Sequence, residues 1–423
     1  MARKLASIVE IESCDPIPDT ERLSVATMKG KGWKVVTGRD EFHRGDLAVY
    51  FEIDSYLPSE DERYAFLKDR CLKRFVSKSG NVLREGIRIK TIKLRGVISQ
   101  GLLMPLSAFV GKEILVENHL AKPEDVVAED GKPVSQEELT DVYISNLYYL
   151  IQQSARVPRT DGGLPGIEKV PLAVDSDLTE LLHVEHYDEV KESLQPQMGC
   201  AISADAMGNF PSAFVPKTDE ERIQNLGDWF ETMKGRKWQV TVKADGTSCT
   251  IAFSPKIDFD NPQIVCSRNL RLKSVTAAGE VPVYWQVAEK YKILEKLSEA
   301  LVGGMEYALQ GEVVGPGIQK DRNKESEYMF KCFRIYDIAN QKFLNPNETV
   351  AFCKEFDIPH VEVLKTDFPF FDEITTMEDA LKFAEGKTKE GNERKGVVCK
   401  TCDDGLYASF KIVSNKYLMK QED

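Results

Sequence analysis

Short runs of alternating hydrophobic and polar residues fill the first 110 positions of the chain. The clearest runs lie at 6–11, 23–28, 33–37, 47–53, 86–93 and 100–105, and glycine or proline residues punctuate them. Alternation with period two places the hydrophobic side chains on one face of a strand. Several short strands in one small region predict a barrel, so residues 1–110 are expected to form an OB-fold-like β-barrel.

The pattern changes twice further along the chain. Residues 111–215 are polar and acidic, with Pro and Gly throughout, and are interpreted as an insertion and a connector. One helix is expected there at 177–194, opened by a sequence that resembles a capping box. From 216 to 423 strands alternate irregularly with helical patterns at 219–233, 284–301 and 377–384. This alternation predicts an α+β domain rather than a regular βαβ series.

Composition places the chain among ordinary globular proteins. Its 423 residues suffice for two or three domains, and 42% hydrophobic with 29% charged residues is typical of a soluble protein. No apolar run approaches the length of a membrane span, and the first residues lack the apolar core of a signal peptide. The nine scattered cysteines fit reduced thiols. We therefore expect an intracellular, cytoplasmic protein with no membrane partner.

Charge is distributed unevenly along the chain. The net charge of −12 argues against simple coating of nucleic acid, yet residues 68–95 are strongly basic. A basic stretch of this kind is suited to following a phosphate backbone, although a solvated loop and strand surface explains it equally well. The candidate nucleic-acid-binding residues in this stretch are Arg88, Lys90, Lys93 and Arg95.

The strongest candidate for chemistry is Lys243. It ends a run, 238–243, that alternates with period two, and Asp245-Gly246 then predicts a hairpin turn into a second strand at 247–253. A lysine at the end of a strand is rigidly held, and its neutral amine can attack a carbonyl carbon or a phosphorus atom. Taken alone, the same pattern also fits a surface lysine beside an ordinary hairpin.

Four further clusters follow Lys243 in the order that a covalent nucleotidyltransferase needs. Arg268 at a strand end can pair with a phosphate or a terminal hydroxyl. Glu312 can accept hydrogen bonds from ribose hydroxyls, Phe333 offers a ring for a base, and Lys411 can meet an α-phosphate. Each cluster alone also fits a core or surface position, but their combined order and spacing favour function. The chain contains no P-loop motif, which excludes P-loop chemistry.

Together these clusters resemble motifs I, Ia, III, IIIa, IV and V of the ATP-dependent ligase and capping-enzyme superfamily. The segments that carry the resemblance are Lys243–Gly246, Ser267–Asn269, Gln310–Gly317, Phe333–Ile338, Gly396–Val398 and Ser409–Asn415. Within the superfamily the chain resembles the RNA ligases of the Deinococcus and Naegleria type. These carry an OB module ahead of the nucleotidyltransferase domain, and 89–96 with 99–102 looks typical of that module. The resemblance implies an antiparallel-sheet, ATP-grasp-like ligase domain at 216–423.

The resemblance also implies a reaction that repairs RNA in three steps. Lys243 is expected to form a lysyl-AMP from ATP, after which the AMP passes to an RNA 5′-phosphate and a 3′-hydroxyl displaces it. Arg268 would orient the phosphate or the 3′ end, Glu312 would hold the ribose, Phe333 would stack on adenine and Lys411 would stabilise charge. Asp245 and Gly246 belong to the same nucleotide site. A divalent cation, Mg²⁺ or Mn²⁺, is expected on the phosphates, and RNA with a nick or broken ends is the expected partner.

Two departures from the family pattern keep alternatives open. Lys395 stands where motif IV usually carries a metal-binding Glu, so Glu393, two residues earlier, becomes the candidate metal ligand. Motif V often supplies two lysines, and here only Lys411 is secure. The alternatives are a nucleic-acid-binding homologue with impaired catalysis, a DNA ligase, and a GTP-using capping enzyme. Capping enzymes usually carry their OB module after the transferase domain rather than before it.

Overall fold

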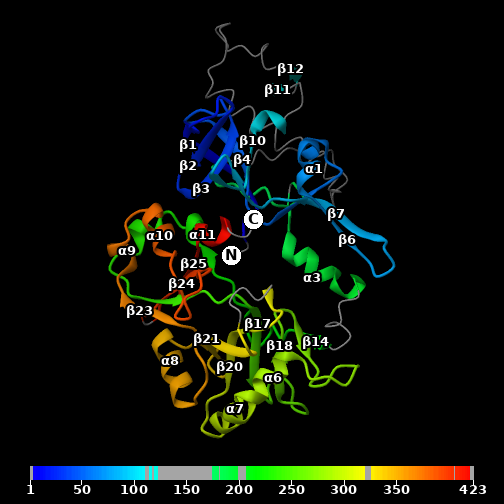
Figure 1. The fold of residues 1–423 in the computed structure, drawn as a ribbon, viewed down its shortest axis with the longest axis vertical. Coiled ribbons are helices and arrows are strands. Elements are labelled where there is room, and N and C mark those ends of the chain that lie inside the picture. The colour runs from blue at the N-terminus through cyan, green and yellow to red at the C-terminus, as the bar shows by residue number, and fades with distance from the viewer. Residues whose placement is uncertain are drawn as a thin grey trace. The chain divides into compact units, whose positions relative to one another are not determined.

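The structure is a computed structural model that describes residues 3–109, 114–116, 119–121, 174–180, 182–198, 206–319, 325–403 and 405–419. The chain forms two compact units, Met1–Met198 and Gly199–Asp423 (Figure 1). The predicted connector 111–215 contributes residues to both units, while most of the predicted insertion lies outside the described residues. Across the described ranges, no helix combines the length and apolar character that crossing a membrane requires. The eight cysteines in these ranges are all free thiols.

A curled antiparallel sheet forms the centre of the first unit. Its strands, in the order β10-β4-β1-β2-β3, are β10 (Leu102–Pro105), β4 (Leu47–Phe51), β1 (Ala6–Pro16), β2 (Leu23–Met28) and β3 (Lys31–Gly38). The first half of β1 pairs with β4, the second half pairs with β2, and a bulge near Ile11 separates the halves. Because a bulge increases local twist, one long strand serves both sides of the barrel. The predicted OB-like barrel is confirmed.

The remaining elements of this unit extend and flank the barrel. A four-stranded sheet runs in the order β13 (Glu185–His186), β5 (Ser55–Pro58), β7 (Val82–Arg88), β6 (Leu72–Val76). Two hairpins pair β8 (Thr91–Leu94) with β9 (Val97–Gln100) and β11 (Ile114–Val116) with β12 (His119–Ala121). The helical elements are η1 (Glu62–Leu67), α1 (Lys68–Cys71), η2 (Leu106–Ala108) and α3 (Tyr187–Met198).

The helix predicted at 177–194 is wrong in its first half, because α3 begins only at Tyr187. The predicted cap residues form local and tertiary contacts instead. Asp177 Oδ1 accepts a hydrogen bond from the backbone N–H of Thr179 at 2.9 Å. Thr179 Oγ1 accepts from the backbone N–H of Leu5, also at 2.9 Å. These side chains therefore fasten the segment to β1 rather than opening a helix.

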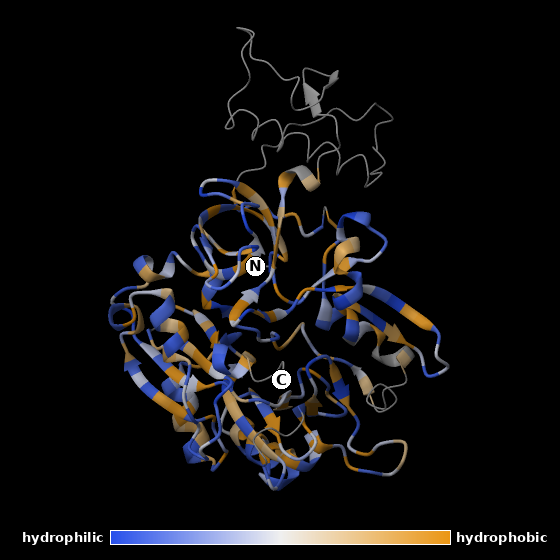
Figure 2. Cartoon of the chain, turned by 45° about the horizontal axis from the view of Figure 1, so that its top comes forward, coloured by the Kyte–Doolittle hydropathy of each residue, from blue (hydrophilic) through white to orange (hydrophobic). Residues whose placement is uncertain are grey.

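Two antiparallel-rich sheets build the second unit. The seven-stranded sheet runs in the order β14 (Ala206–Asn209), β19 (Leu270–Leu272), β18 (Gln263–Cys266), β17 (Thr247–Phe253), β20 (Tyr307–Val314), β21 (Met329–Asp337), β22 (Lys342–Phe343). The five-stranded sheet runs β15 (Glu221–Arg222), β25 (Ser409–Val413), β24 (Gly396–Thr401), β16 (Trp238–Val242), β23 (Val363–Phe368). Hydrophobic and hydrophilic positions mix along these strands as they do along those of the first unit (Figure 2).

Helices cover both sheets of the second unit. Residues of α6 (Val283–Lys290), α7 (Ile293–Val302) and α8 (Pro346–Glu355) share one hydrophobic core with the seven-stranded sheet. The five-stranded sheet packs against η4 (Ile223–Asn225), α5 (Trp229–Thr232), α9 (Phe370–Glu373) and α10 (Met377–Phe383). The chain's last described element is α11 (Asn415–Met419). The α+β architecture predicted for this part of the chain is confirmed.

Two helical predictions in this unit need correction. The pattern at 219–233 forms the short strand β15, one 3-10 turn and the short helix α5, because Glu221 and Arg222 pair in parallel with β25. The pattern at 284–301 forms two helices, because Lys292 adopts a left-handed conformation with φ of 50° between α6 and α7. In both places a tertiary contact or one backbone angle overrides the helical periodicity.

Candidate active site

Lys243 lies where the chain passes from one sheet to the other. It directly follows β16, and its backbone N–H donates to the carbonyl of Gly396 at 2.9 Å. The predicted hairpin is wrong, because β16 pairs with β23 and β24 whereas β17 pairs with β18 and β20. A Cβ on Gly246 would lie 2.2 Å from the carbonyl oxygen of Val313, so only glycine allows this close approach to β20. Lys243 is thereby fixed at the junction of the two sheets.

Glu312 lies on β20, the strand that pairs with β17, and contacts the linker that follows Lys243. Its Oε1 accepts a hydrogen bond from the backbone N–H of Gly246 at 3.2 Å. Burial raises the pKa of the Glu312 carboxyl, and the positive charges of Lys243 and Lys395 act in the opposite direction. The carboxylate predicted to hold the ribose is therefore next to the predicted nucleophile.

Asp219 forms ion pairs with two of the predicted cations, Lys411 and Arg268. Its Oδ1 pairs with Lys411 Nζ at 2.6 Å, and its Oδ2 lies 3.7 Å from Nη2 of Arg268. Surrounding protein atoms oppose ionisation of Asp219, but Lys411, Arg268 and then Lys243 outweigh them and hold the pKa of the carboxyl below its usual value. Lys243, Lys411 and Arg268, which are far apart in the sequence, thus converge on one carboxylate. Sequence reasoning missed Asp219, because its segment has a helical pattern and carries no local sign of this contact.

Phe333 sits at a β-bulge above a buried lysine. In the pairing of β21 with β20, Gln310 opposes Arg334 and Gly311 opposes Cys332, so Phe333 is the extra residue. Lys400 Nζ donates to the backbone carbonyl of Phe333 and lies 5.2 Å from the centre of its ring. Burial, followed by the charge of Arg334, lowers the pKa of Lys400 to about 7. The position of the ring is therefore tied to a charged group in the core.

Arg334, the residue after Phe333 in β21, forms a buried ion pair with Glu220. Arg334 Nη2 lies 3.3 Å from Glu220 Oε1, and its guanidinium is 4.8 Å from the ring centres of both Phe343 and Tyr407. Burial opposes ionisation of Glu220, but Arg334 and Lys400 outweigh it and lower the pKa of that carboxyl. Three charged groups and two stacked rings therefore form one network that sequence reasoning did not find.

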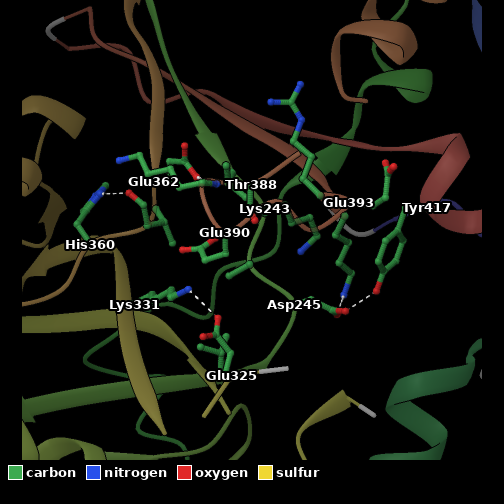
Figure 3. A pocket seen from close by; sticks show the side chains of 17 residues that line it. Lys243, Asp245, Glu325, Lys331, His360, Glu362, Thr388, Glu390, Glu393 and Tyr417 are labelled. Carbon is green, nitrogen blue, oxygen red and sulfur yellow. Dashed lines mark hydrogen bonds and ion pairs between the residues drawn. The ribbon is translucent and has the colours of Figure 1, made fainter. Parts of the chain in front are cut away.

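Asp245 is a second carboxylate that pairs with a lysine, but it is far less exposed than Asp219. Its Oδ1 pairs with Lys395 Nζ at 2.7 Å, and its Oδ2 accepts a hydrogen bond from the Tyr417 hydroxyl (Figure 3). The side chain of Asp245 is 8% exposed, whereas that of Asp219 is 53% exposed. Burial lowers the pKa of Lys395, Lys243 adds to this, and Asp245 counteracts it. Lys395 therefore interacts with both the motif I carboxylate and the predicted nucleophile.

A pocket of about 250 Å³ opens beside Lys243 (Figure 3). Lys243, Asp245 and Glu393 line it, whereas Arg268, Glu312, Phe333 and Lys411 are not part of its lining. The lining continues over His360, Glu362, Thr388, Glu390, Lys331 and Glu325. Burial lowers the pKa of His360 to about 4, which keeps this ring neutral at neutral pH.

The residues beside Lys243 do not form a metal site of their own. Glu393, the candidate ligand, pairs with Lys416 at 3.1 Å, and Asp245 pairs with Lys395. Over the described part of the chain, no three His, Cys, Asp or Glu side chains lie close enough together to hold an ion. The role of Glu393 as a metal ligand stays a prediction.

The four candidate nucleic-acid-binding residues in the first unit differ in their surroundings. Arg88 pairs with Asp54 at 2.7 Å, and its guanidinium lies 4.0 Å from the ring centre of Tyr187. Lys90, Lys93 and Arg95 are exposed. Arg95 and Gly96 both have positive φ and form the tight turn between β8 and β9, which places Arg95 at the hairpin tip, with Lys93 close to it and Lys90 at the other end of β8.

An OB-like barrel followed by two sheets that meet at a lysine defines the class of covalent nucleotidyltransferases with an N-terminal OB domain. Comparison with family models agrees with this class. Residues 5–106 match a model described as an OB-fold domain, and residues 236–413 match the model described as RNA ligase. Residues 236–413 therefore form a domain of the RNA ligase type, and an OB-fold domain precedes it.

Solved structures of one protein resemble this chain over its whole length. A point mutant of Naegleria gruberi RNA ligase with AMP and Mn has 29% sequence identity and a TM-score of 0.71, with 100% of each chain covered. Another point mutant of that ligase, with ATP and Mn, has 29% identity and a TM-score of 0.70 at the same coverage. The same ligase with PPi also gives 29% identity, a TM-score of 0.70 and full coverage. Comparison with the curated proteins gave no match.

Proposed function

We propose that the chain is an ATP-dependent RNA ligase that joins a 3′-hydroxyl end to a 5′-phosphate end through a lysyl-AMP. One observation carries the proposal: Lys243 lies at the junction of the two sheets, Glu312 binds the linker that follows it, and Lys411 and Arg268 pair with Asp219, whose pKa Lys243 also lowers. A nucleophile, a buried carboxylate and two cations at one point fit a nucleoside phosphate better than they fit a structural lysine.

In the first step Lys243 attacks the α-phosphorus of ATP, which is a substrate. The Nζ–P bond forms, the bond from that phosphorus to the bridging oxygen breaks, and pyrophosphate leaves with the electron pair while the amine loses a proton to solvent. Lys411 and Arg268 exchange Asp219 for phosphate oxygens and stabilise the charge that develops there. Glu312, whose Oε1 accepts from the backbone N–H of Gly246, accepts from the ribose hydroxyls.

The next two steps use the same positions. The terminal 5′-phosphate of RNA attacks the phosphorus of the lysyl-AMP, so that a phosphoanhydride bond forms and the Lys243 nitrogen leaves and regains a proton. The RNA 3′-oxygen then attacks the activated 5′-phosphate, a phosphodiester bond forms, and AMP leaves. Phe333, at its bulge beside Lys400, stacks on the adenine throughout and keeps the AMP in place.

ATP and a divalent cation are the proposed requirements. Support comes from the similar Naegleria gruberi RNA ligase, whose structures contain ATP or AMP together with Mn. Mg²⁺ or Mn²⁺ accompanies the triphosphate in reactions of this class. RNA rather than DNA is the proposed substrate, and the cytoplasm is the proposed place of action.

Incubation with α-labelled ATP and Mn²⁺, followed by a denaturing gel, tests the proposal. We expect label on the wild-type protein and none on Lys243→Ala, with Lys342→Ala, an exposed lysine on β22, as the labelled control. Label from GTP instead of ATP would favour a capping-type enzyme. Absence of label with either nucleotide and either metal would leave the catalytically impaired homologue. Sealing of nicks with RNA or DNA on the 3′-hydroxyl side then separates RNA ligase from DNA ligase.

The exposed basic residues of the first unit are the proposed RNA contacts. We expect the triple change Lys90→Ala, Lys93→Ala, Arg95→Ala to weaken RNA binding and to lower the salt dependence by about one phosphate contact per residue. Arg88→Ala differs, because Arg88 pairs with Asp54 and stacks on Tyr187, and it should lower the melting temperature as well. RNA binding that the triple change leaves intact, with the same salt slope, would remove this proposal.

A further inference from the structure

Lys395 reverses the charge expected beside the nucleophile. Its ammonium pairs with Asp245 at 2.7 Å, and the two side chains are only 25% and 8% exposed. Tyr417 donates to the other oxygen of Asp245, so both oxygens of this carboxylate are already engaged. A divalent cation that used Asp245 as a ligand would have to displace an ammonium group already paired with it.

The backbone fixes Lys395 in this place. The carbonyl of Lys395 accepts from the N–H of Ser414 at 2.9 Å, and the carbonyl of the next residue, Gly396, accepts from the N–H of Lys243 at 2.9 Å. A Cβ on Gly396 would lie 2.0 Å from the carbonyl oxygen of Ile412, so β24 begins in tight contact with β25. Lys395 is therefore as rigidly positioned relative to Lys243 as adjacent strands of one sheet allow.

We infer that Lys395 is a built-in cation which takes over, beside Lys243, the electrostatic role of a protein-bound divalent metal, so that the only metal needed for adenylyl transfer arrives with the ATP phosphates. The chemical half of the inference, that Lys395 assists adenylyl transfer, rests on the proposed function. Its structural half, that the described residues beside Lys243 form no metal site before ATP binds, depends on the paired carboxylates alone.

The neighbouring groups agree with this assignment. Glu393, the remaining acidic residue on this edge of the pocket, is paired with Lys416 at 3.1 Å. The ammonium of Lys395 and the carboxylate of Asp245 form a compact pair next to the reacting amine, where low solvent exposure makes a fixed charge more effective than in water. A fixed cation needs no reorganisation when negative charge develops on the phosphorus oxygens.

The first experiment measures metal binding without nucleotide, by the electron paramagnetic resonance signal of unbound Mn²⁺. We expect wild-type protein to show no Mn²⁺ site tighter than about 10⁻³ M, the weak end of carboxylate sites. Lys395→Glu should bind Mn²⁺ at least about 10-fold more tightly, because it removes the competing ammonium and adds a ligand. Lys382→Glu, the same charge change on the exposed face of α10, should bind as wild type does. A tight Mn²⁺ site in the wild-type protein would overturn the inference.

The second experiment measures lysyl-AMP formation in single turnovers at fixed ATP with increasing Mn²⁺. The wild-type rate should reach its plateau when Mn²⁺ equals ATP. Lys395→Met should lower the maximal rate about 10²-fold, as loss of one preorganised charge does, while the ATP concentration at half-maximal rate changes less than about twofold. Lys395→Arg keeps the charge and should recover most of the rate. Melting temperatures identify any variant that fails to fold.

The outcomes separate the two proposals. Faster adenylylation by Lys395→Met or Lys395→Glu at equimolar Mn²⁺ would mean that Lys395 hinders catalysis, which refutes the inference while leaving the ligase intact. A wild-type rate that keeps rising with Mn²⁺ well beyond ATP would refute it in the same way. If wild-type protein forms no lysyl-AMP at all, the proposed function fails, and the chemical half of the inference fails with it. The Mn²⁺ titration still decides the structural half.

Discussion

Two aspartates flank Lys243, and each is paired with a lysine, but the two pairs are built differently. Asp219 is more than half exposed, and it engages two cations from separate parts of the chain, Lys411 within β25 and Arg268 between β18 and β19. Asp245 is almost fully buried, and its partners are Lys395 and a tyrosine hydroxyl. An exposed pair exchanges its carboxylate for another anion at little cost, whereas a buried pair leaves an uncompensated charge when it opens.

The comparison teaches that similar ion pairs have different uses on the two sides of one nucleophile. On the Asp219 side we propose that the carboxylate occupies the cations until a phosphate replaces it. On the Asp245 side the pair is a permanent part of the site. The first three predictions below test this difference, beginning with the largest expected change in rate, and a fourth tests the buried Lys400.

Loss of Lys411 should have the largest effect. Lys411→Ala is expected to slow lysyl-AMP formation about 10²–10³-fold, because it removes a positioned donor for the α-phosphate. Single-turnover labelling from α-labelled ATP measures the rate. Lys416→Ala, a change of the more exposed lysine that pairs with Glu393, is the control and should stay within about threefold of wild type. Equal losses in both variants would show that overall charge, not position, matters.

Removal of the exposed carboxylate should act in the opposite direction on binding. Asp219→Asn is expected to tighten ATP binding by roughly 3- to 10-fold, because Lys411 and Arg268 no longer lose an anionic partner when the phosphate arrives. Calorimetric titration with ATP on a Lys243→Ala background prevents turnover. Weaker binding would mean that Asp219 orients the cations and does not compete for them.

Removal of a partner from the buried carboxylate should mainly reduce stability. Tyr417→Phe deletes the hydroxyl that donates to Asp245, and we expect a loss of about 1–3 kcal/mol in the free energy of unfolding. Denaturant unfolding measures this loss, and ATP affinity should not change. Tyr291→Phe, a half-buried tyrosine at the end of α6, controls for the loss of any hydroxyl. A Tyr417→Phe protein as stable as wild type would remove the claim that the Asp245 pair is structural.

The last prediction concerns the pH dependence of stability, through Lys400 behind the proposed base site. Folding lowers the pKa of Lys400 to about 7 from about 10.4 in an unfolded chain. The folded state therefore binds fewer protons in this window, and the cost of burying the charge, absent above about pH 10.4, grows as pH falls and is complete below about 7. Wild-type stability should thus rise from pH 7 toward 10 relative to Lys400→Met, in denaturant unfolding. Parallel curves for the two proteins would contradict this assignment.

The sequence predicted much of the site because its motifs mark strand ends. Lys243, Glu312 and Lys411 were assigned to strands or strand ends, and those strands exist. The Asp-Gly turn failed because a local hairpin signal does not show whether the next strand joins the same sheet. Here a close approach of Gly246 to β20 decides that it joins another one.

Contacts between distant residues account for what sequence reasoning missed. Asp219 lies 192 positions from Lys411, and Asp245 lies 150 positions from Lys395. Nothing local to either aspartate indicates its partner, and the helical pattern at 219–233 pointed to the wrong element. The Lys395 departure itself was visible in the sequence, but its meaning depended on which carboxylate it reaches.

The passage of the chain between the two sheets has a mechanical consequence for the nucleophile. Only Lys243 to Gly246 join β16 to β17, with Lys243 tied to Gly396 in one sheet and Gly246 tied to Glu312 in the other. A small rotation of one sheet against the other would therefore stretch or relax this linker and change the distance between the amine and β20. The position of the Lys243 amine therefore depends on the angle between the two sheets that its linker joins.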